Sequence, residues 1–181
     1  MSWLAGHTTS ILVVAVVVAA AASAAVLAIA AYSAHTVVRP RRDWQPADWR
    51  PPQHQVEAVY FQNRAGDVLH GWLLPPAARG AIVIVCHGFG TNRREGQDLL
   101  PWLHAAGYGA LLFDFQAHGQ STGRYTTVGV REVDDLLSAV RFLQERFGPD
   151  VPLVGIGFSM GASVLILAAA QCKAIRAIVA D

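Results

Sequence analysis

The alternation of short apolar runs with helix-period stretches constrains the fold of this chain more than any other feature. Four runs rich in Val, Ile and Leu lie at 81–86, 108–113, 151–156 and 175–180. Continuous runs of this length predict strands that are buried on both faces of a parallel sheet. Stretches with helical spacing separate these runs, at 96–106, 130–147 and 160–170. We therefore expect an α/β fold with a mostly parallel sheet, right-handed crossovers and helices on both faces.

A hairpin is predicted at the start of this domain. Residues 56–62 alternate between apolar and polar side chains, and the cluster Asn-Arg-Ala-Gly-Asp at 63–67 is a turn signal. Residues 68–74 then form a returning strand that ends before Pro75. We expect the α/β domain to occupy residues 56–181.

A second feature is the apolar run 11–31, in which Ser23 is the one polar residue. As a helix rising about 1.5 Å per residue, the run matches a bilayer core of roughly 30 Å. We expect residues 1–34 to form an N-terminal tail and one transmembrane helix, followed by a linker at 35–55. A cleaved signal peptide is the alternative, because Ser33 and Ala34 offer small residues for a cleavage site.

The charges around this run predict its orientation. Four arginines follow the run and none precedes it: Arg39, Arg41, Arg42 and Arg50. The positive-inside rule then favours a single-pass protein whose domain lies in the cytoplasm. Trp44 and Trp49 in the linker suit a membrane interface, and an ordinary polar linker explains them equally well.

Composition excludes several classes of function. The chain has a formal net charge of +1, which gives no support for a nucleic-acid partner. Cys86 and Cys172 lie far apart and are expected to be free thiols, and the histidines are too scattered to suggest a metal site. The Gly-x-Gly at 155–157 lacks the third glycine of a dinucleotide fingerprint, and no P-loop lysine follows. We therefore expect neither metal nor cofactor.

The segment 157–161 reads GFSMG, with Ser159 between a predicted buried strand and a predicted apolar helix. A strand–turn–helix setting of this kind presents a serine nucleophile on a tight, strained bend. Gly157 and Gly161 leave room where a side chain would clash with the neighbouring strand and helix. The helix that begins at Met160 points its free N–H groups towards the bend. The alternative is that Ser159 only caps this helix.

The segment 87–90, HGFG, follows another predicted strand and suggests an oxyanion hole. The backbone N–H groups of Phe89 and Met160 are the expected donors to a developing oxyanion. Gly88 lets the main chain approach a substrate. We expect His87 to support this loop rather than to act as the general base.

The polar segment 114–121, DFQAHGQS, is expected to hold its own loop in shape, with His118 a weak candidate for the base. Together the segments HGFG, DFQAHGQS and GFSMG resemble the α/β-hydrolase superfamily, close to its serine peptidase and esterase-like branch. The resemblance covers 56–181. One departure is Gln116-Ala117, where relatives carry Arg-Gly, and this puts the loop's detail in doubt.

The resemblance implies a serine hydrolase with a triad in the order Ser, acid, His. After Ser159 there is no histidine, and Asp181 is the only acid. We expect Asp181 to mark a strand end. The catalytic acid and base are expected to belong to a missing C-terminal part. This fragment alone is therefore expected to be inactive. The expected substrate is an ester, thioester or peptide, and the anchor favours a lipid-like acyl group. The alternative is a non-catalytic membrane-anchored binding or scaffold protein, and the sequence predicts no oligomeric state.

Overall fold

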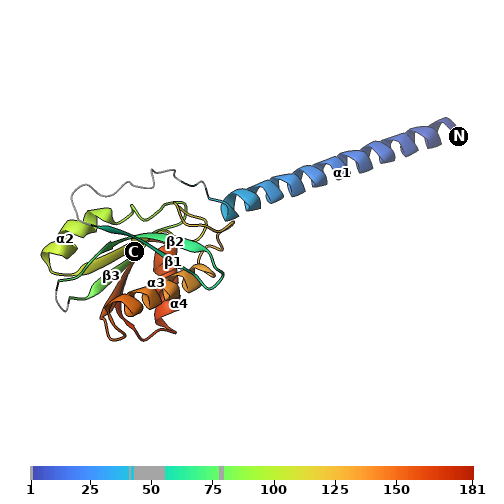
Figure 1. The fold of residues 1–181 in the computed structure, drawn as a ribbon. Helices are drawn as coiled ribbons and strands as arrows, with labels where there is room; N and C mark the ends of the chain where they lie inside the picture. Colours follow the sequence, from blue (N-terminus) through green and yellow to red (C-terminus); the bar gives the residue numbers. More distant parts are fainter. Residues whose placement is uncertain (1, 41, 43–55, 78–79) are drawn as a thin grey trace. The chain divides into compact units, whose positions relative to one another are not determined.

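The computed structural model describes residues 2–40, 42, 56–77 and 80–181 (Figure 1). The chain divides into two compact units, one up to Val37 and one from Val38 onwards. Most of the expected linker, including Trp44, Trp49, Arg41 and Arg50, lies outside the described residues.

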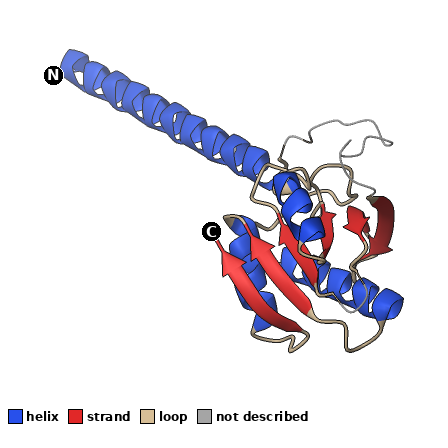
Figure 2. Cartoon of the chain, turned by 90° about the vertical axis from the view of Figure 1, so that its left-hand side faces the viewer, coloured by secondary structure: helices blue, strands red, loops and turns tan. Residues whose placement is uncertain are grey.

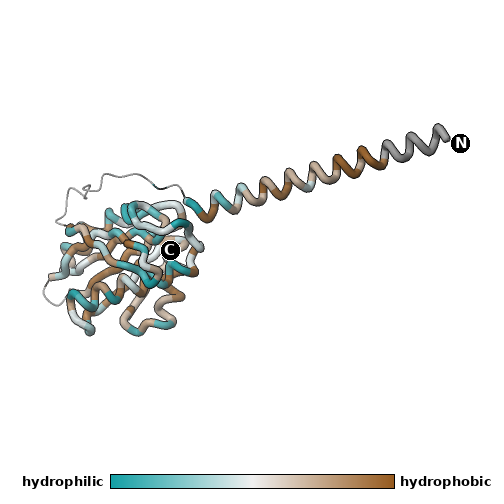
Figure 3. Tube along the Cα trace, turned by 45° about the vertical axis from the view of Figure 1, so that its right-hand side comes forward, coloured by the Kyte–Doolittle hydropathy of each residue, from teal (hydrophilic) through white to brown (hydrophobic). Residues whose placement is uncertain are grey.

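The first unit is one long helix, α1, Ser2–Val38. Its stretch Leu12–Val38 has a mean hydropathy of 2.8 and none of it is buried, so it is long and apolar enough to cross a membrane. Figure 3 colours much of this helix as hydrophobic. The expected apolar helix is therefore present and extends beyond 11–31 at both ends. An N-terminal signal sequence meets the same criteria, so the membrane span stays a prediction.

In the described part of the second unit, six strands form one sheet in the order β1-β2-β4-β3-β5-β6 (Figure 2). The strands are β1 Glu57–Gln62, β2 Val68–Leu74, β3 Ile82–Cys86, β4 Gly109–Phe113, β5 Leu153–Gly157 and β6 Ile175–Ala180. Strands β1 and β2 form the predicted antiparallel hairpin, and β2 joins β4 antiparallel. The pairs β3–β4, β3–β5 and β5–β6 are parallel, as the four apolar runs predict.

Helices cover both faces of this sheet, which confirms the predicted layers. On one face, helix α3 (Glu132–Phe147) and helix α4 (Met160–Ala169) bury Leu136, Leu143 and Leu165 against the strands. On the other face, helix α2 (Leu100–Ala105) buries Leu100 against Val83 and Val85. The loops that contain the candidate functional residues follow the carboxyl ends of β3, β4 and β5.

The helix predicted over 96–106 is shorter than expected. It begins as a 3₁₀ turn, η1 Gln97–Leu99, in which the Leu100 N–H donates to the Gln97 carbonyl. Pro101 has no N–H with which to continue the helical ladder back to Gln97. The regular α-helix is therefore confined to α2.

The sheet's two edges differ in what covers them. Strand β1 packs against α3 through Phe61, whose ring stacks on that of Phe142 with centroids 5.1 Å apart. At the other edge, among the described residues, β6 exposes Val179, and α4 exposes Ile166 and Leu167. The apolar surface of the domain therefore continues over α4 and β6.

Candidate active site

Ser159 lies at the bend between β5 and α4, and its backbone is strained. Its φ is 48° and its ψ is −110°, a region that a residue with a side chain rarely adopts. The Ser159 N–H donates to the carbonyl of Asp181 at 2.7 Å, and the Phe158 N–H donates to the carbonyl of Cys86 at 3.0 Å. The bend is therefore fixed from both sides, by the end of β3 and by the residue after β6.

The glycines beside Ser159 are required by close packing. A Cβ atom on Gly161 would lie 2.2 Å from the carbonyl oxygen of Cys86, and one on Gly157 would lie 2.6 Å from the backbone N of Ala162. Both distances are shorter than any real contact, and backbone atoms cannot move aside without breaking the sheet. Glycine at 161 therefore lets α4 approach β3 closely, and glycine at 157 lets it begin close to β5.

In the structure, Ser159 does not act as a side-chain cap of α4. Ser159 occupies the N-cap position, but its side chain makes no capping hydrogen bond. Its backbone carbonyl instead accepts the N–H groups of Ala162 and Ser163, at 3.1 and 3.2 Å. The residue is exposed, and within the described part of the chain its hydroxyl has no hydrogen-bond partner.

The loop after β3 lies directly against this bend. A Cβ atom on Gly88 would lie 3.5 Å from the Cβ of Ser159 and 3.4 Å from the carbonyl oxygen of Phe158. Among the described residues, the backbone N–H groups of Phe89 and Met160 meet no acceptor. The structure thus places Gly88 against Ser159, and the residues that follow these two in the chain, Phe89 and Met160, each have a free N–H.

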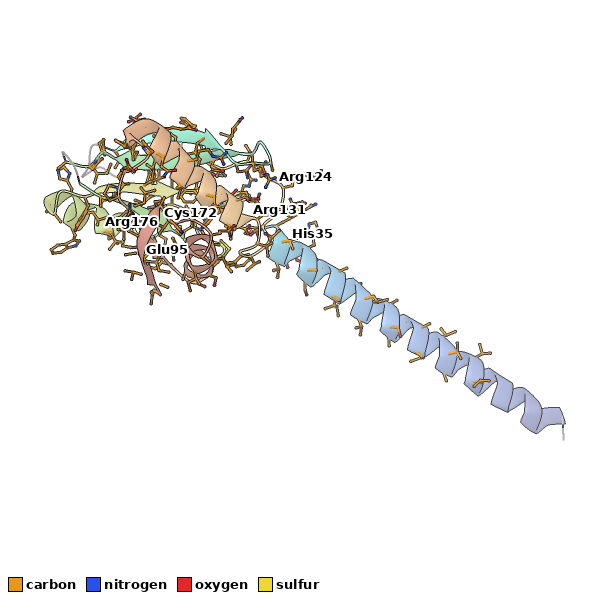
Figure 4. The ribbon with its side chains drawn as sticks, turned by 90° about the horizontal axis from the view of Figure 1, so that it is seen from below. His35, Glu95, Arg124, Arg131, Cys172 and Arg176 are labelled. Carbon is orange, nitrogen blue, oxygen red and sulfur yellow. The ribbon has the colours of Figure 1, made fainter. Side chains whose placement is uncertain are left out.

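A residue that the sequence did not single out, Glu95, holds this loop. Its Oε2 accepts the Gly88 N–H at 2.5 Å and the Thr91 hydroxyl at 2.8 Å. The same hydroxyl lies 3.2 Å from the Gly88 carbonyl oxygen. Glu95 lies between β3 and α2 in the chain and is labelled in Figure 4. No motif in a single sequence marks this acid, because the contact spans a loop whose path only the fold determines.

His87 is fully buried, and backbone groups engage both of its ring nitrogens. Nε2 accepts the Phe115 N–H at 3.0 Å, so the proton lies on Nδ1, which donates to the Gly88 carbonyl at 2.7 Å. Burial lowers the pKa of His87 to about 4. A neutral imidazole held in this way suits support of the loop and has no nitrogen free to take a proton from Ser159.

His118 also lies beneath the loop. Its Nδ1 is 2.9 Å from the carbonyl of Gln116, and its ring centroid lies 5.0 Å from that of His87 and 6.1 Å from that of Phe89. Burial, and next the proximity of His87, lower the pKa of His118 to about 4. The neutral His118 ring therefore packs against the rings of His87 and Phe89, and no hydrogen bond joins it to Ser159 in the described part of the chain.

The loop that contains His118 is clamped by a buried ion pair. Asp114 accepts the Arg93 N–H and the Arg93 Nη1, both at 2.6 Å, and the Gln120 N–H at 2.9 Å. The Ser121 hydroxyl donates to the Asp114 carbonyl at 2.6 Å. Burial raises the pKa of the Asp114 carboxyl, and the charge of Arg93 opposes that rise.

Asp181 pairs with the bend as a strand residue does. Its N–H donates to the Gly157 carbonyl at 3.0 Å, and its own carbonyl accepts the Ser159 N–H. No hydrogen bond or ion pair joins its side chain to a histidine in the described part of the chain. Within those same residues, no group of three His, Cys, Asp or Glu side chains could hold a metal ion.

Comparison with known proteins places this chain in a family. Residues 77–180 match the family of serine aminopeptidases, S33. Rat monoglyceride lipase is 33% identical over 135 residues, which cover 73% of this chain and 42% of the lipase. The polyketide transferase ATR5 of Stachybotrys chlorohalonatus is 31% identical over 128 residues, which cover 68% of this chain and 43% of the transferase.

Solved structures of hydrolases are also similar to this chain. The esterase Pf2001 of Pyrococcus furiosus superimposes with a TM-score of 0.70 at 34% identity, over 80% of this chain and 57% of the esterase. The α/β hydrolase GrgF of Penicillium gives a TM-score of 0.64 at 28% identity, over 69% of this chain and 45% of GrgF. This chain thus spans between two fifths and three fifths of the length of these relatives. With more than half of its residues matched by the family and its fold shared with these hydrolases, the chain belongs to the serine aminopeptidase S33 family of α/β hydrolases.

Proposed function

We propose that Ser159 is the nucleophile of a serine hydrolase that cleaves an ester, thioester or peptide bond through an acyl-enzyme. The observation that carries the proposal is the strained, exposed and uncapped Ser159, with free N–H groups on Phe89 in the adjacent loop and on Met160 at the start of α4. A strained conformation persists only where the surrounding structure imposes it, and such strain is concentrated at functional sites.

In the proposed reaction, the Ser159 oxygen attacks the substrate carbonyl carbon while its proton passes to a general base. The negative charge that develops on the carbonyl oxygen accepts hydrogen bonds from the N–H groups of Phe89 and Met160. The intermediate collapses, the leaving group takes the proton from the base, and an acyl-enzyme remains. Attack by water then releases the acid and restores Ser159.

The base and its acid are proposed to come from residues of the whole protein beyond residue 181. His87 and His118 are engaged in the loop's packing, so neither suits the role. The relatives are about twice as long as the stretch that they share with this chain. The exposed apolar residues Val179, Ile166 and Leu167 give a further segment a surface on which to pack.

A lipid-like acyl ester or thioester is the proposed substrate class. Support comes from the relatives, which include a monoglyceride lipase, an esterase and the thiohydrolase aneE of Aspergillus aculeatus, 30% identical to this chain. The apolar helix α1 is proposed to anchor the protein as a single-pass segment, with the domain in the cytoplasm. Resistance to alkaline carbonate extraction tests the anchor, and protection of the domain from protease added to sealed cells tests the orientation.

Hydrolysis of p-nitrophenyl esters of graded acyl length, by a polypeptide extended along the downstream reading frame, tests the proposal. Ser159→Ala is expected to lower kcat by about 10⁴-fold or more, because it removes the nucleophile. Ser163→Ala is the matched control, since Ser163 is exposed on the same helix and should keep full activity. A well-folded extended protein whose turnover is unaffected by Ser159→Ala would favour the alternative of a binding protein on this fold.

A further inference from the structure

A cavity lies away from the Ser159 bend. It has a volume of about 270 Å³ and is lined by Asn63, Arg64, Ala65, Gln116, Arg131 and Asp134. These residues come from the turn between β1 and β2, the loop after β4, and the N-terminal end of α3. None of the residues proposed for hydrolysis lines it.

The wall of this cavity is held rigidly by a buried carboxylate on α3. Asp135 accepts the Asn63 side-chain amide at 2.7 Å on one oxygen and the Gln116 backbone N–H at 2.8 Å on the other. The Asn63 side-chain oxygen in turn accepts the N–H groups of Ala65 and Asp67, at 3.0 and 2.9 Å. Turn, loop and helix are therefore tied together, and the cavity between them keeps its shape.

Within this wall, the side chain of Gln116 is unsatisfied. Gln116 is 2% exposed, and its Nε2 has no hydrogen-bond partner. A buried amide NH₂ group without an acceptor costs free energy, and each such group calls for an explanation, of which a missing partner is one. In the same loop the Nε2 of His118 also has no partner, but His118 does not line this cavity. Because the NH₂ group can only donate, that partner must present an acceptor atom.

Two arginines line the same cavity. Arg64 and Arg131 are both exposed, and within the described residues neither lies within ion-pairing distance of a carboxylate. The guanidinium of Arg131 is positioned over the ring of Tyr125, 5.0 Å from its centroid. The N-terminus of α3 adds its partial positive charge, and Asp134 is the acid among the lining residues.

Other acids near this helix end are already engaged. Glu132 accepts the Thr126 hydroxyl, the Thr127 hydroxyl and N–H, and the Gly129 N–H. Asp135 is bonded to Asn63 and Gln116 as described. The lining therefore offers two guanidinium groups and one amide NH₂ against the single carboxylate of Asp134.

We propose that this cavity binds a small anion that carries a phosphate or a carboxylate group. Arg64 and Arg131 pair with its charge, and the Gln116 amide donates to one of its oxygens. The site is separate from the proposed hydrolysis, so either can fail without the other. A cation would instead meet the two positive charges of Arg64 and Arg131.

The test is titration calorimetry on the full chain in detergent micelles, with inorganic phosphate and acetate titrated separately at constant ionic strength in chloride. We expect saturable binding of at least one ion, and the ion that binds identifies the group that the cavity accepts. Arg131→Gln and Arg64→Gln should each weaken that binding by roughly fivefold, the upper range for an exposed charge pair. Arg176→Gln on β6 is the control, because it removes the same charge away from the cavity and should leave the affinity unchanged. Arg131 and Arg176 are both labelled in Figure 4.

Gln116→Met separates binding from a structural role. The variant keeps the side-chain volume and removes the unsatisfied amide, so its unfolding temperature without the anion should be equal to or above that of the native chain. The rise in unfolding temperature that the anion produces should be lost. Absence of saturable binding for both ions, or equal weakening by Arg176→Gln, would overturn the proposal even if Gln116→Met failed to fold.

Discussion

Ser159 and Asp114 both lie at the carboxyl edge of the same sheet, yet their surroundings are opposite. Asp114 directly follows β4, is buried, and is bonded to Arg93, Gln120 and Ser121. Ser159 is the second residue after β5, is exposed and strained, and its hydroxyl has no partner in the described part of the chain. A polar residue with every bond satisfied stabilises the fold, whereas one held in strain with a free hydroxyl is available for chemistry.

The largest effect is expected from Asp114→Ala. It leaves the guanidinium of Arg93 buried without its carboxylate and removes the acceptor of two backbone N–H groups. Loss of one partner from a buried ion pair costs about 3–5 kcal/mol. The free energy of unfolding, measured in urea, should fall by that amount. A loss below about 1 kcal/mol would mean that the ion pair does not clamp the loop.

A smaller effect is expected from Glu95→Ala, which removes the acceptor of the Gly88 N–H. Amide hydrogen exchange at Gly88 should become about tenfold faster, since a hydrogen bond contributes roughly 1 kcal/mol or slightly more. Glu95→Gln keeps an acceptor oxygen and should restore most of the protection. Equal exchange in the native chain and both variants would show that Glu95 does not hold this loop.

Ser159→Gly is expected to act in the opposite direction to Asp114→Ala. Glycine adopts a positive φ without steric cost, so relief of strain at φ 48° should stabilise the fold by about 1 kcal/mol. Ser163→Gly, in a regular turn of α4, is the control and should destabilise by a similar amount. If both substitutions destabilise equally, the bend at Ser159 stores no strain.

The net change of stability with pH is expected to be the smallest effect. Buried acids and buried histidines change the free energy of unfolding in opposite directions as the pH changes. Burial raises the pKa of Asp135 to about 7 from its ordinary value of 3.8, so the folded state binds this proton more tightly. The contribution of Asp135 to stability therefore falls as pH rises from about 4 to 7. His87 and His118, with pKa values lowered to about 4, contribute stability that is lost as pH falls from 6.5 to 4.

Asp135→Asn isolates the first of these contributions. Without the Asp135 proton, the free energy of unfolding should rise more steeply with pH between 4 and 7 than it does in the native chain. Urea titrations at several pH values measure the two slopes. Identical slopes would show that Asp135 has the same pKa in the folded and unfolded states.

The sequence predicts the strands and the bend because their signals are local. The apolar runs become β3 to β6, and the GFSMG segment forms a turn between a strand and a helix, as its glycines require. Contacts between distant segments carry no such signal. Glu95 on Gly88, Asn63 on Asp135 and the Ser159 N–H on Asp181 depend on the path of the chain, which residue spacing alone does not determine. The shortened helix α2 could have been predicted from Pro101, whose missing N–H interrupts the ladder.

The Ser159 hydroxyl, which lies on a strained bend after β5, is proposed to be a nucleophile. The most direct test is intact-mass and peptide mass spectrometry after reaction of the extended protein with a fluorophosphonate. The account predicts one phosphonyl group per chain, located on the peptide that contains Ser159 and absent from Ser159→Ala. A folded protein that takes up no phosphonyl group, or takes it up elsewhere to the same extent in Ser159→Ala, would contradict it.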